Sequence, residues 1–471
     1  MKKRLIGMLS TVVLCATVLL LVPMCAPNNA VAPVVAPAAV SEVRLGIVAP
    51  MGTSTGVQYW QGAQLTADEI NKAGGIKVGE VKVPLTLIKC DDNEFVNITD
   101  AALAMERLIV SDKANFVMGG LRTEAVRVMQ DVAMEHKTIF INLISGDPMV
   151  TMRVHDDYAK YKYFFRSVGL DNRLTALFHF LAAEPVVRKI QDSGIEPKIA
   201  MLTEKDAWGD SQNTVWSDRL NHLGIKIVGS WNPSAVATDV TSELLAIKNA
   251  GANVIFTALS AQAGLSFAKG WADLQIPACT TGCCTESTKA TFWDDLGGRA
   301  NYFSGSGGFG MSYVACTDKT IPFWTKYRER FGNTGSVNGY EPFVYDSIYV
   351  LKEAIERAGT LDADAVVAEL EKTDHLGAGG RLVFTGVDVD SSHDITYAPG
   401  YITYTAVQWR DGKQVTIWPK KDFPSKSWGK GYLGSGELAT PQWMVQKWPD
   451  AEWGVEYEGT GNFELPPWFK E

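Results

Sequence analysis

The chain has 471 residues, of which 46% are hydrophobic, and a formal net charge of −9. This length exceeds the roughly 150 residues typical of one domain, so we expect two or three lobes with large apolar cores. The acidic balance argues against nucleic acid as a partner, because a nucleic-acid-binding protein would favour a basic face.

The amino terminus has the pattern of an export signal. Three basic residues, Lys2, Lys3 and Arg4, precede an apolar run over residues 5–22. This pattern predicts a signal peptide over residues 1–25, although the run approaches the roughly 20 residues of a membrane anchor. Two cleavage sites stay open: before Cys25, which would then carry a lipid, or among the small residues after Ala26. Residues 26–42, rich in Ala, Pro and Val, are expected to form a tether.

Next, short β-branched runs alternate with helical patterns. Strands are predicted at 43–48, 83–88, 116–118 and 138–143. Between them, apolar residues recur at helical spacing, as in Ala63, Ala67 and Ile70 before the stop at Gly74 and Gly75. Strand and helix in alternation predict a parallel sheet covered on both faces.

A second series of the same kind follows. Strands are predicted at 198–203, 225–228 and 254–257, with helices between them that end near Gly224 and Gly251. Val344, Ile348, Leu351 and Ile355 mark a further helix, which must pack on one of the two sheets. The sequence therefore predicts two α/β units in tandem.

Several short segments agree in order and spacing with one known pattern. These are Leu45-Gly46-Ile47-Val48-Ala49-Pro50, Gly62-Ala63, Glu69-Ile70-Asn71, Ala73-Gly74-Gly75-Ile76, Asp206-Ala207-Trp208-Gly209-Asp210 and Gln408-Trp409-Arg410-Asp411-Gly412-Lys413. Together they resemble the leucine/isoleucine/valine-binding protein family of type I periplasmic solute-binding proteins, from about residue 43 to 419.

The resemblance implies an α/β fold with two doubly wound parallel-sheet lobes joined by three crossovers. We place the crossovers near 166–171, 303–308 and 377–381. Lobe 1 then comprises residues 43–167 and 307–378, and lobe 2 comprises 168–306 and 379–419. The Trp-, Gly- and Pro-rich extension over 420–471 is expected to wrap over the lobes, with docking to a partner as the alternative.

The resemblance also implies a ligand site in the loops between the lobes. The candidate residues are Thr55, Tyr59, Leu121, Arg122, Thr123, Ile144, Ser145, Gly146, Trp208, Ser260, Gln262, Cys283 and Glu286. Thr55 or Tyr59 would close over one end of the ligand, and Thr123 matches the hydroxyl that grips its carboxylate. Residues 144–146 would supply a carbonyl and a second hydroxyl. Trp208 falls where the second lobe presents an aromatic lid.

Two positions depart from the pattern of an amino-acid binder. Cys283 lies in the loop expected over 280–284, where the family places an acid for the ligand ammonium, and Glu286 is a candidate substitute. Arg122 stands where a small residue is usual, and either contacts the ligand or lies on the surface.

Cysteine spacing suggests a local disulfide, between Cys279 and either Cys283 or Cys284, because export allows oxidation. No cysteine and histidine clusters have the paired spacing of a zinc site, so we expect no metal and no cofactor.

The function that the resemblance implies is that of an extracytoplasmic substrate-binding protein of an ABC importer, not an enzyme. Its partners would be a small carboxylate, amino-acid-like or aromatic-acid ligand and the transporter permease, with no nucleic acid. We expect a monomer, periplasmic or extracytoplasmic, that meets the membrane only through a lipid on Cys25. The alternative is a ligand-binding sensory protein.

Overall fold

The computed structural model describes residues 40–168, 171–289, 291–308, 317–332, 340–396, 401–402, 405–418 and 464–470. The predicted signal peptide, most of the tether and Cys25 lie outside these residues.

The first sheet has five parallel strands in the order β4-β1-β5-β6-β7. Their bounds are β1 Val43–Ala49, β4 Leu85–Asp91, β5 Phe116–Gly119, β6 Ile139–Asn142 and β7 Phe164–Arg166. The surrounding helices are α1 (Ser54–Lys72), α2 (Ile98–Glu106), α3 (Thr123–Glu135), α4 (Pro148–Asp156), α13 (Tyr340–Ala358) and α14 (Ala363–Leu370). This arrangement confirms the predicted parallel sheet.

Helix α1 begins where the Thr53 side chain accepts a hydrogen bond from the Gly56 amide, and Gly74 and Gly75 follow its end with positive φ angles. Such conformations suit glycine, which has no Cβ. Gly62 lets α13 approach closely, since a Cβ there would lie 2.9 Å from the Glu341 carbonyl oxygen. The helix predicted around Val344 is therefore α13, and it packs on α1.

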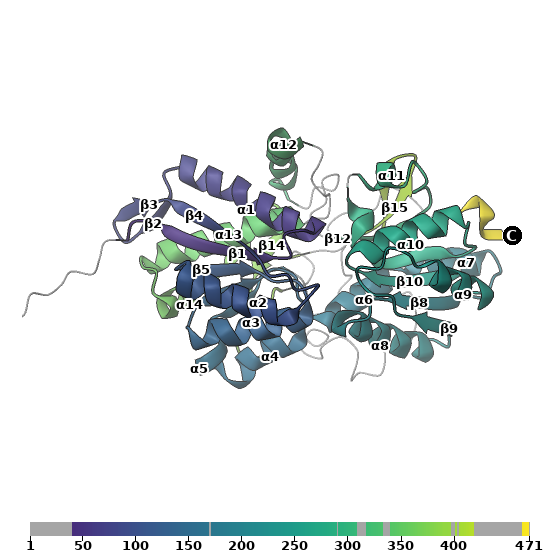
Figure 1. The fold of residues 1–471 in the computed structure, drawn as a ribbon, viewed down its shortest axis with the longest axis horizontal. Coiled ribbons are helices and arrows are strands. Elements are labelled where there is room, and N and C mark those ends of the chain that lie inside the picture. The colour runs from purple at the N-terminus through teal and green to yellow at the C-terminus, as the bar shows by residue number, and fades with distance from the viewer. Residues whose placement is uncertain are drawn as a thin grey trace, which may run out of the picture. The chain divides into compact units, whose positions relative to one another are not determined.

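The second sheet has four parallel strands in the order β11-β10-β8-β9. Their bounds are β8 Lys198–Thr203, β9 Lys226–Trp231, β10 Val254–Leu259 and β11 Cys279–Cys284. The accompanying helices are α6 (Asn172–Ala182), α7 (Glu184–Asp192), α8 (Ala207–His222), α9 (Thr241–Asn249) and α10 (Gln262–Asp273). Figure 1 shows α10 and α8 on either side of β8 and β10.

Alternation along β8 explains why helices cover both faces of this sheet. Ile199 and Met201 belong to the same buried cluster as Trp216 of α8, whereas Ala200 and Leu202 cluster with Phe267 of α10. Successive side chains of a strand point to opposite faces, so a strand that is apolar throughout needs cover on both.

The remaining strands form smaller sheets. The antiparallel sheet β12-β15-β16 comprises Ser304–Gly308, Thr405–Arg410 and Lys413–Trp418, and the hairpins are β2-β3 (Ile76–Val78, Val81–Val83) and β13-β14 (Asp374–Leu376, Arg381–Val383). The other helices are α12 (Thr320–Phe331) and the short helices η1 (Arg107–Ser111), α5 (Tyr158–Tyr161), η2 (Thr285–Thr288), α11 (Phe292–Asp295) and η4 (Pro467–Lys470). Strand β12 occupies the place where the second crossover was predicted.

Two expectations about cysteine and local structure were wrong. Residues 280–284 belong to strand β11 rather than to a loop. None of the cysteines in the described part of the chain forms a disulfide. An extended strand rises about 3.3 Å per residue, so four or five residues carry two cysteines beyond the roughly 7 Å limit between bridged Cα atoms. Cys316 lies outside the described residues.

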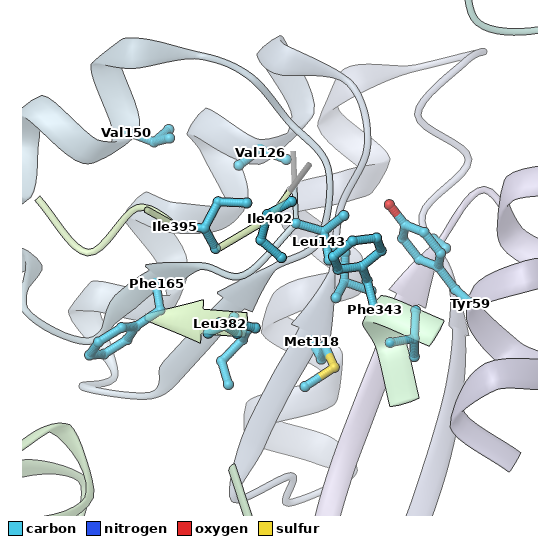
Figure 2. Close-up of a cluster of buried hydrophobic side chains, with 14 of the residues drawn as sticks. Tyr59, Met118, Val126, Leu143, Val150, Phe165, Phe343, Leu382, Ile395 and Ile402 are labelled. Carbon is cyan, nitrogen blue, oxygen red and sulfur yellow. The ribbon is translucent and has the colours of Figure 1, made fainter. Parts of the chain in front are cut away.

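Residues after the predicted third crossover at 377–381 pack against β7 of the first sheet (Figure 2). Leu382, Ile395 and Ile402 are buried in the same cluster as Phe165, as Figure 2 shows. The ring centroids of Phe165 and Phe384 lie 5.0 Å apart. Phe384 therefore lies against Phe165 of β7. The lobe boundaries as a whole remain a prediction.

Of the C-terminal extension, the structure describes residues 464–470. The Trp468 indole donates to the Ile276 carbonyl at 3.0 Å, and its ring centroid lies 5.3 Å from that of Trp271 in α10. Arg410 of β15 pairs with Glu464 at 3.1 Å. This short segment therefore packs beside the second and third sheets, which is consistent with a wrap.

Candidate functional site

The candidate residues lie at the carboxyl ends of strands from both large sheets. Parallel strands end at one edge of a sheet, where the following helices begin, so loops gather there and can hold a ligand. The first sheet contributes the segments after β1, β4, β5 and β6. The second contributes those after β8, β10 and β11.

Thr55 and Tyr59 both lie in the first half of α1 and are buried. The Tyr59 ring makes an edge contact with Tyr340 at 6.3 Å between centroids. Figure 2 places this ring beside Phe343, within a cluster of apolar side chains. Burial raises the pKa of Tyr59 well above its ordinary value, and its hydroxyl has no hydrogen-bond partner among the described residues.

The segment after β5 turns sharply before α3. Gly119 and Gly120 have positive φ angles, and a Cβ on Gly119 would collide with the Val48 carbonyl. The side-chain amide of Asn142 donates hydrogen bonds to the backbone carbonyls of Gly119 at 2.8 Å and Gly120 at 3.2 Å. Helix α3 then begins at Thr123, which is buried. Leu121 is partly buried in the same turn.

The buried carboxylate of Glu94 accepts a hydrogen bond from the backbone of this turn. Glu94, which follows β4, accepts a hydrogen bond from the Arg122 amide at 3.1 Å. Burial and the neighbouring Asp92 raise the pKa of Glu94 well above its ordinary value. Burial likewise raises the pKa of Asp92 to about 7. The string Asp91-Asp92-Asn93-Glu94 directly after a strand was the sequence signal for these residues, which sequence reasoning missed.

Arg122 is held by acidic and aromatic neighbours. Its guanidinium donates to the Glu94 carbonyl at 3.4 Å and lies 3.8 Å from the Glu124 carboxylate. The ring of Phe95 lies 5.6 Å from the guanidinium carbon. Glu124 also accepts a hydrogen bond from the Ala207 amide of α8 at 3.2 Å. Arg122 is thus part of a contact between loops of the two sheets.

The segment after β6 contains the next three candidates. Ile144 is partly buried, and Ser145 and Gly146 are buried. The Ser145 carbonyl accepts from Arg166 at 2.9 Å, and the Gly146 carbonyl accepts from the Asn172 amide at 2.6 Å. The Ser145 hydroxyl is buried and has no hydrogen-bond partner in the described part of the chain. Both carbonyls are therefore used within the protein, whereas the hydroxyl has unused capacity.

Trp208 lies in the first turn of α8, which Asp206 caps by accepting from the Gly209 amide at 2.7 Å. The indole is partly buried and packs against the larger core cluster. Burial raises the pKa of Asp206, and the charge of Arg122 opposes this shift. Trp208 is therefore the aromatic side chain that α8 brings to the loops.

Ser260 and Gln262 follow β10, but they have different surroundings. The Ser260 hydroxyl donates to Glu204 at 2.7 Å, and Glu204 also accepts from the Ala261 amide at 3.1 Å. Burial raises the pKa of Glu204 to about 7. Gln262, the first residue of α10, is exposed. Ser260 is therefore engaged in shaping its own loop.

Cys283 lies near the end of β11, and Glu286 lies in η2, which follows this strand. The Cys283 thiol is partly exposed and lies 3.9 Å from the Thr285 hydroxyl. Glu286 is buried, forms an ion pair with Lys289, and accepts from the Ser54 hydroxyl of α1 at 3.1 Å. The positive charge of Lys289 thus balances the negative charge of Glu286 without a ligand. Tyr340, in the first turn of α13, adds its ring next to Tyr59; residues 333–339 before it are not described.

The described residues contain neither a metal-binding cluster nor a membrane-spanning helix. No group of three or more His, Cys, Asp or Glu side chains there could hold a metal ion. In the same part of the chain, no helix has both the length and the apolar character needed to span a bilayer.

Two parallel α/β units arranged in this way have the fold of the type I periplasmic binding proteins. The model of the periplasmic binding protein family matches residues 42–401, and the chain belongs to that family. This is a family of solute-binding proteins and not of enzymes.

Relatives of known description agree with this assignment. The Leu/Ile/Val-binding protein homolog 3 of Brucella melitensis is 24% identical over 388 residues, which are 81% of this chain and 95% of that protein. An amino acid binding protein of Pseudomonas aeruginosa is 28% identical over 221 residues, 46% of this chain. The match spans about half, 54%, of that relative's length.

Solved structures share the fold at lower identity. The branched-chain amino acid transporter substrate-binding protein LivJ of Streptococcus pneumoniae, in complex with isoleucine, has a TM-score of 0.65 at 18% identity, covering 79% of this chain and 98% of that one. A solute-binding protein of an ABC transporter from Rhodopseudomonas palustris, in complex with 3,4-dihydroxybenzoic acid, has a TM-score of 0.63 at 19% identity, covering 79% and 95%.

Proposed function

We propose that this chain is the extracytoplasmic substrate-binding protein of an ABC importer, which closes two lobes on a small carboxylate or amino-acid-like ligand and delivers it to the permease. One observation on this chain supports the closing of two lobes, in addition to the family assignment. The helices that follow strands of the two large sheets contact each other at their first turns in two places, Ser54 with Glu286 and Glu124 with the Ala207 amide. Such contacts are expected of a clamp that closes by hinge motion.

The ligand carboxylate would lie at the first sheet. The amino terminus of α3 favours an anion because unpaired amides and the helix dipole point toward it. Thr123 is the first residue of this helix, and the Ser145 hydroxyl has unused hydrogen-bonding capacity. Arg122 would contribute positive charge from the adjacent position.

The other end of the ligand would be neutral or apolar. Glu286 is paired with Lys289, and Glu204 is engaged with Ser260 and Ala261. A buried ammonium without a partner would cost several kcal/mol. Trp208 offers an aromatic surface to this end. The two solved complexes, with isoleucine and with an aromatic acid, bracket the chemistry to be tested.

A thermal-shift panel on the mature protein tests the proposal. It should include leucine, isoleucine, valine, other amino acids, benzoates and short aliphatic acids. We expect stabilisation by carboxylates that lack an ammonium group, and weaker stabilisation of Arg122→Ala. Tight binding of leucine with Arg122→Ala unaffected would overturn the ligand class and would point to Glu286 or Asp206 as the ammonium partner.

The proposed location outside the cytoplasm rests on the basic and apolar leader. Metabolic labelling with a radioactive fatty acid, compared between the natural chain and Cys25→Ala, distinguishes a lipid anchor from ordinary cleavage after Ala26. Label lost in Cys25→Ala supports the anchor. An unlabelled natural chain rejects it.

A further inference from the structure

Arg166, the last residue of β7, is fully buried and forms an ion pair with a distant segment. Its Nε donates to Asp394 Oδ1 at 2.8 Å, and its Nη2 donates to Asp394 Oδ2. Burying two charges is costly unless their geometry is good and their remaining hydrogen bonds are satisfied. The hydrogen bonds of the third guanidinium nitrogen, Nη1, therefore indicate the role of this buried ion pair.

That donor holds the backbone of a candidate ligand loop. Arg166 Nη1 donates to the carbonyls of Ser145 and Asp147, both at 2.9 Å. These two carbonyls flank Gly146. The guanidinium thus fixes the curvature of the segment that presents the Ser145 hydroxyl.

Residues after Arg166 bind the end of β6 and the loop that follows it. The Ser167 amide donates to the Asn142 carbonyl at 3.0 Å, and the Asn172 amide donates to the Gly146 carbonyl at 2.6 Å. Asn172 begins α6, which accompanies the second sheet. The loop after β6 is therefore hydrogen-bonded to the segment that leads from the first sheet to the second.

Asp394 is itself held in place. Its carboxylate accepts from the Ile395 amide at 2.9 Å, and the neighbouring His393 ring stacks on Phe165 with 4.0 Å between centroids. The His393 carbonyl accepts from the Arg166 amide at 2.9 Å. A backbone bond and a ring stack thus lock the partner of Arg166.

We infer that Arg166, oriented by Asp394, is a positioning residue for ligand binding: it fixes residues 145–147 so that the Ser145 hydroxyl faces the ligand. The functional part of this inference rests on the proposed function. The ligand does not touch Arg166. Ligand contact at Ser145 is instead linked to Asn172 at the start of α6, which accompanies the second sheet.

The first test uses the unliganded mature protein. In Arg166→Lys and Asp394→Asn, amide hydrogen exchange should become faster at residues 143–147 but not in the loop at 119–123. Arg188→Lys is the matched control, because Arg188 pairs at 2.7 Å with buried Glu184 in α7. It should lower the melting temperature without changing exchange at 143–147. Exchange that is unchanged, or faster at both loops alike, would overturn the inference.

The second test uses isoleucine and 3,4-dihydroxybenzoate as probes in titration calorimetry. For whichever probe binds the natural chain, Arg166→Lys and Ser145→Ala should each weaken binding by about tenfold or less. The double variant should be no weaker than the stronger single variant, because both changes remove one interaction. Additive losses would contradict action through Ser145. If neither probe binds, the ligand class is in question, while hydrogen exchange still decides the role of Arg166.

Discussion

Ser54, at the start of α1, donates a hydrogen bond across 3.1 Å to Glu286, which lies 232 residues further along the chain beside β11. If the lobes close as proposed, this bond forms only in the closed state. Ser54→Ala should then weaken ligand binding by about 1 kcal/mol, roughly fivefold, measured by titration calorimetry. Ser242→Ala, which removes an exposed bond to Glu243 within α9, is the control and should leave affinity unchanged. Equal affinity of both variants would exclude Ser54 as a closing contact.

Trp208 should contribute binding energy through its ring. Trp208→Ala removes a partly buried indole at the start of α8, and the lost burial is expected to cost about 2 kcal/mol of affinity. Trp293→Ala, a partly buried indole that packs on the second cluster, serves as the control for general destabilisation. Calorimetry that gives the natural affinity for Trp208→Ala would refute a lid role.

Closure itself is measurable in solution. Two rigid lobes that rotate about short connecting segments become more compact when a ligand is held between them. Small-angle scattering should give a smaller radius of gyration at saturating ligand, with a non-binding compound from the panel as the control. A profile that does not change at saturation would rule out the clamp mechanism.

Stability should fall as the pH rises, because several carboxyl groups are buried. Glu341 in α13 is fully buried, and burial raises its pKa from 4.5 to about 8. Between these pH values the folded protein keeps a proton that the unfolded chain releases. Each pH unit in this window therefore lowers the free energy of unfolding by up to about 1.4 kcal/mol from this group.

Glu341→Gln keeps the shape and removes this titration. Its melting temperature should decline less between pH 5 and pH 8 than that of the natural chain. Glu369→Gln is the control, because ion pairs with Lys372 and Arg357 lower the pKa of Glu369 at the surface. If the melting temperatures of the natural chain and Glu341→Gln changed in parallel with pH, burial would not raise the pKa of Glu341.

The sequence predicted the parallel strands well because their signal is local. Buried strands such as β1 and β10 are mostly apolar, with one polar residue each, and helices such as α1 end at glycines that adopt positive φ angles. Strands β11 and β12 lack this signal, since their sequences are Thr, Gly, Cys and Ser. Their places are set by pairing with neighbours, which no local pattern encodes.

The sequence indicated which loops form the candidate site but not which residues support them. The resemblance proposes Thr123, Ser145 and Trp208 as ligand contacts, and their role stays a prediction. The residues that support the surrounding loops come from elsewhere in the chain. Glu94 supports the turn before α3, and Asp394 orients Arg166 although 228 residues separate the two. Such support depends on tertiary contacts between distant segments, so spacing in the sequence could not reveal it.

The four thiols that the structure describes differ in accessibility. Cys90, Cys279 and Cys284 are buried, and burial raises the pKa of Cys90 to about 11. Thiolate is the reactive form, so these three should react slowly with maleimides in the folded protein. Cys283 is partly exposed at the end of β11, beside the proposed ligand. An environment-sensitive dye attached there would turn the protein into an optical reporter of its own ligand.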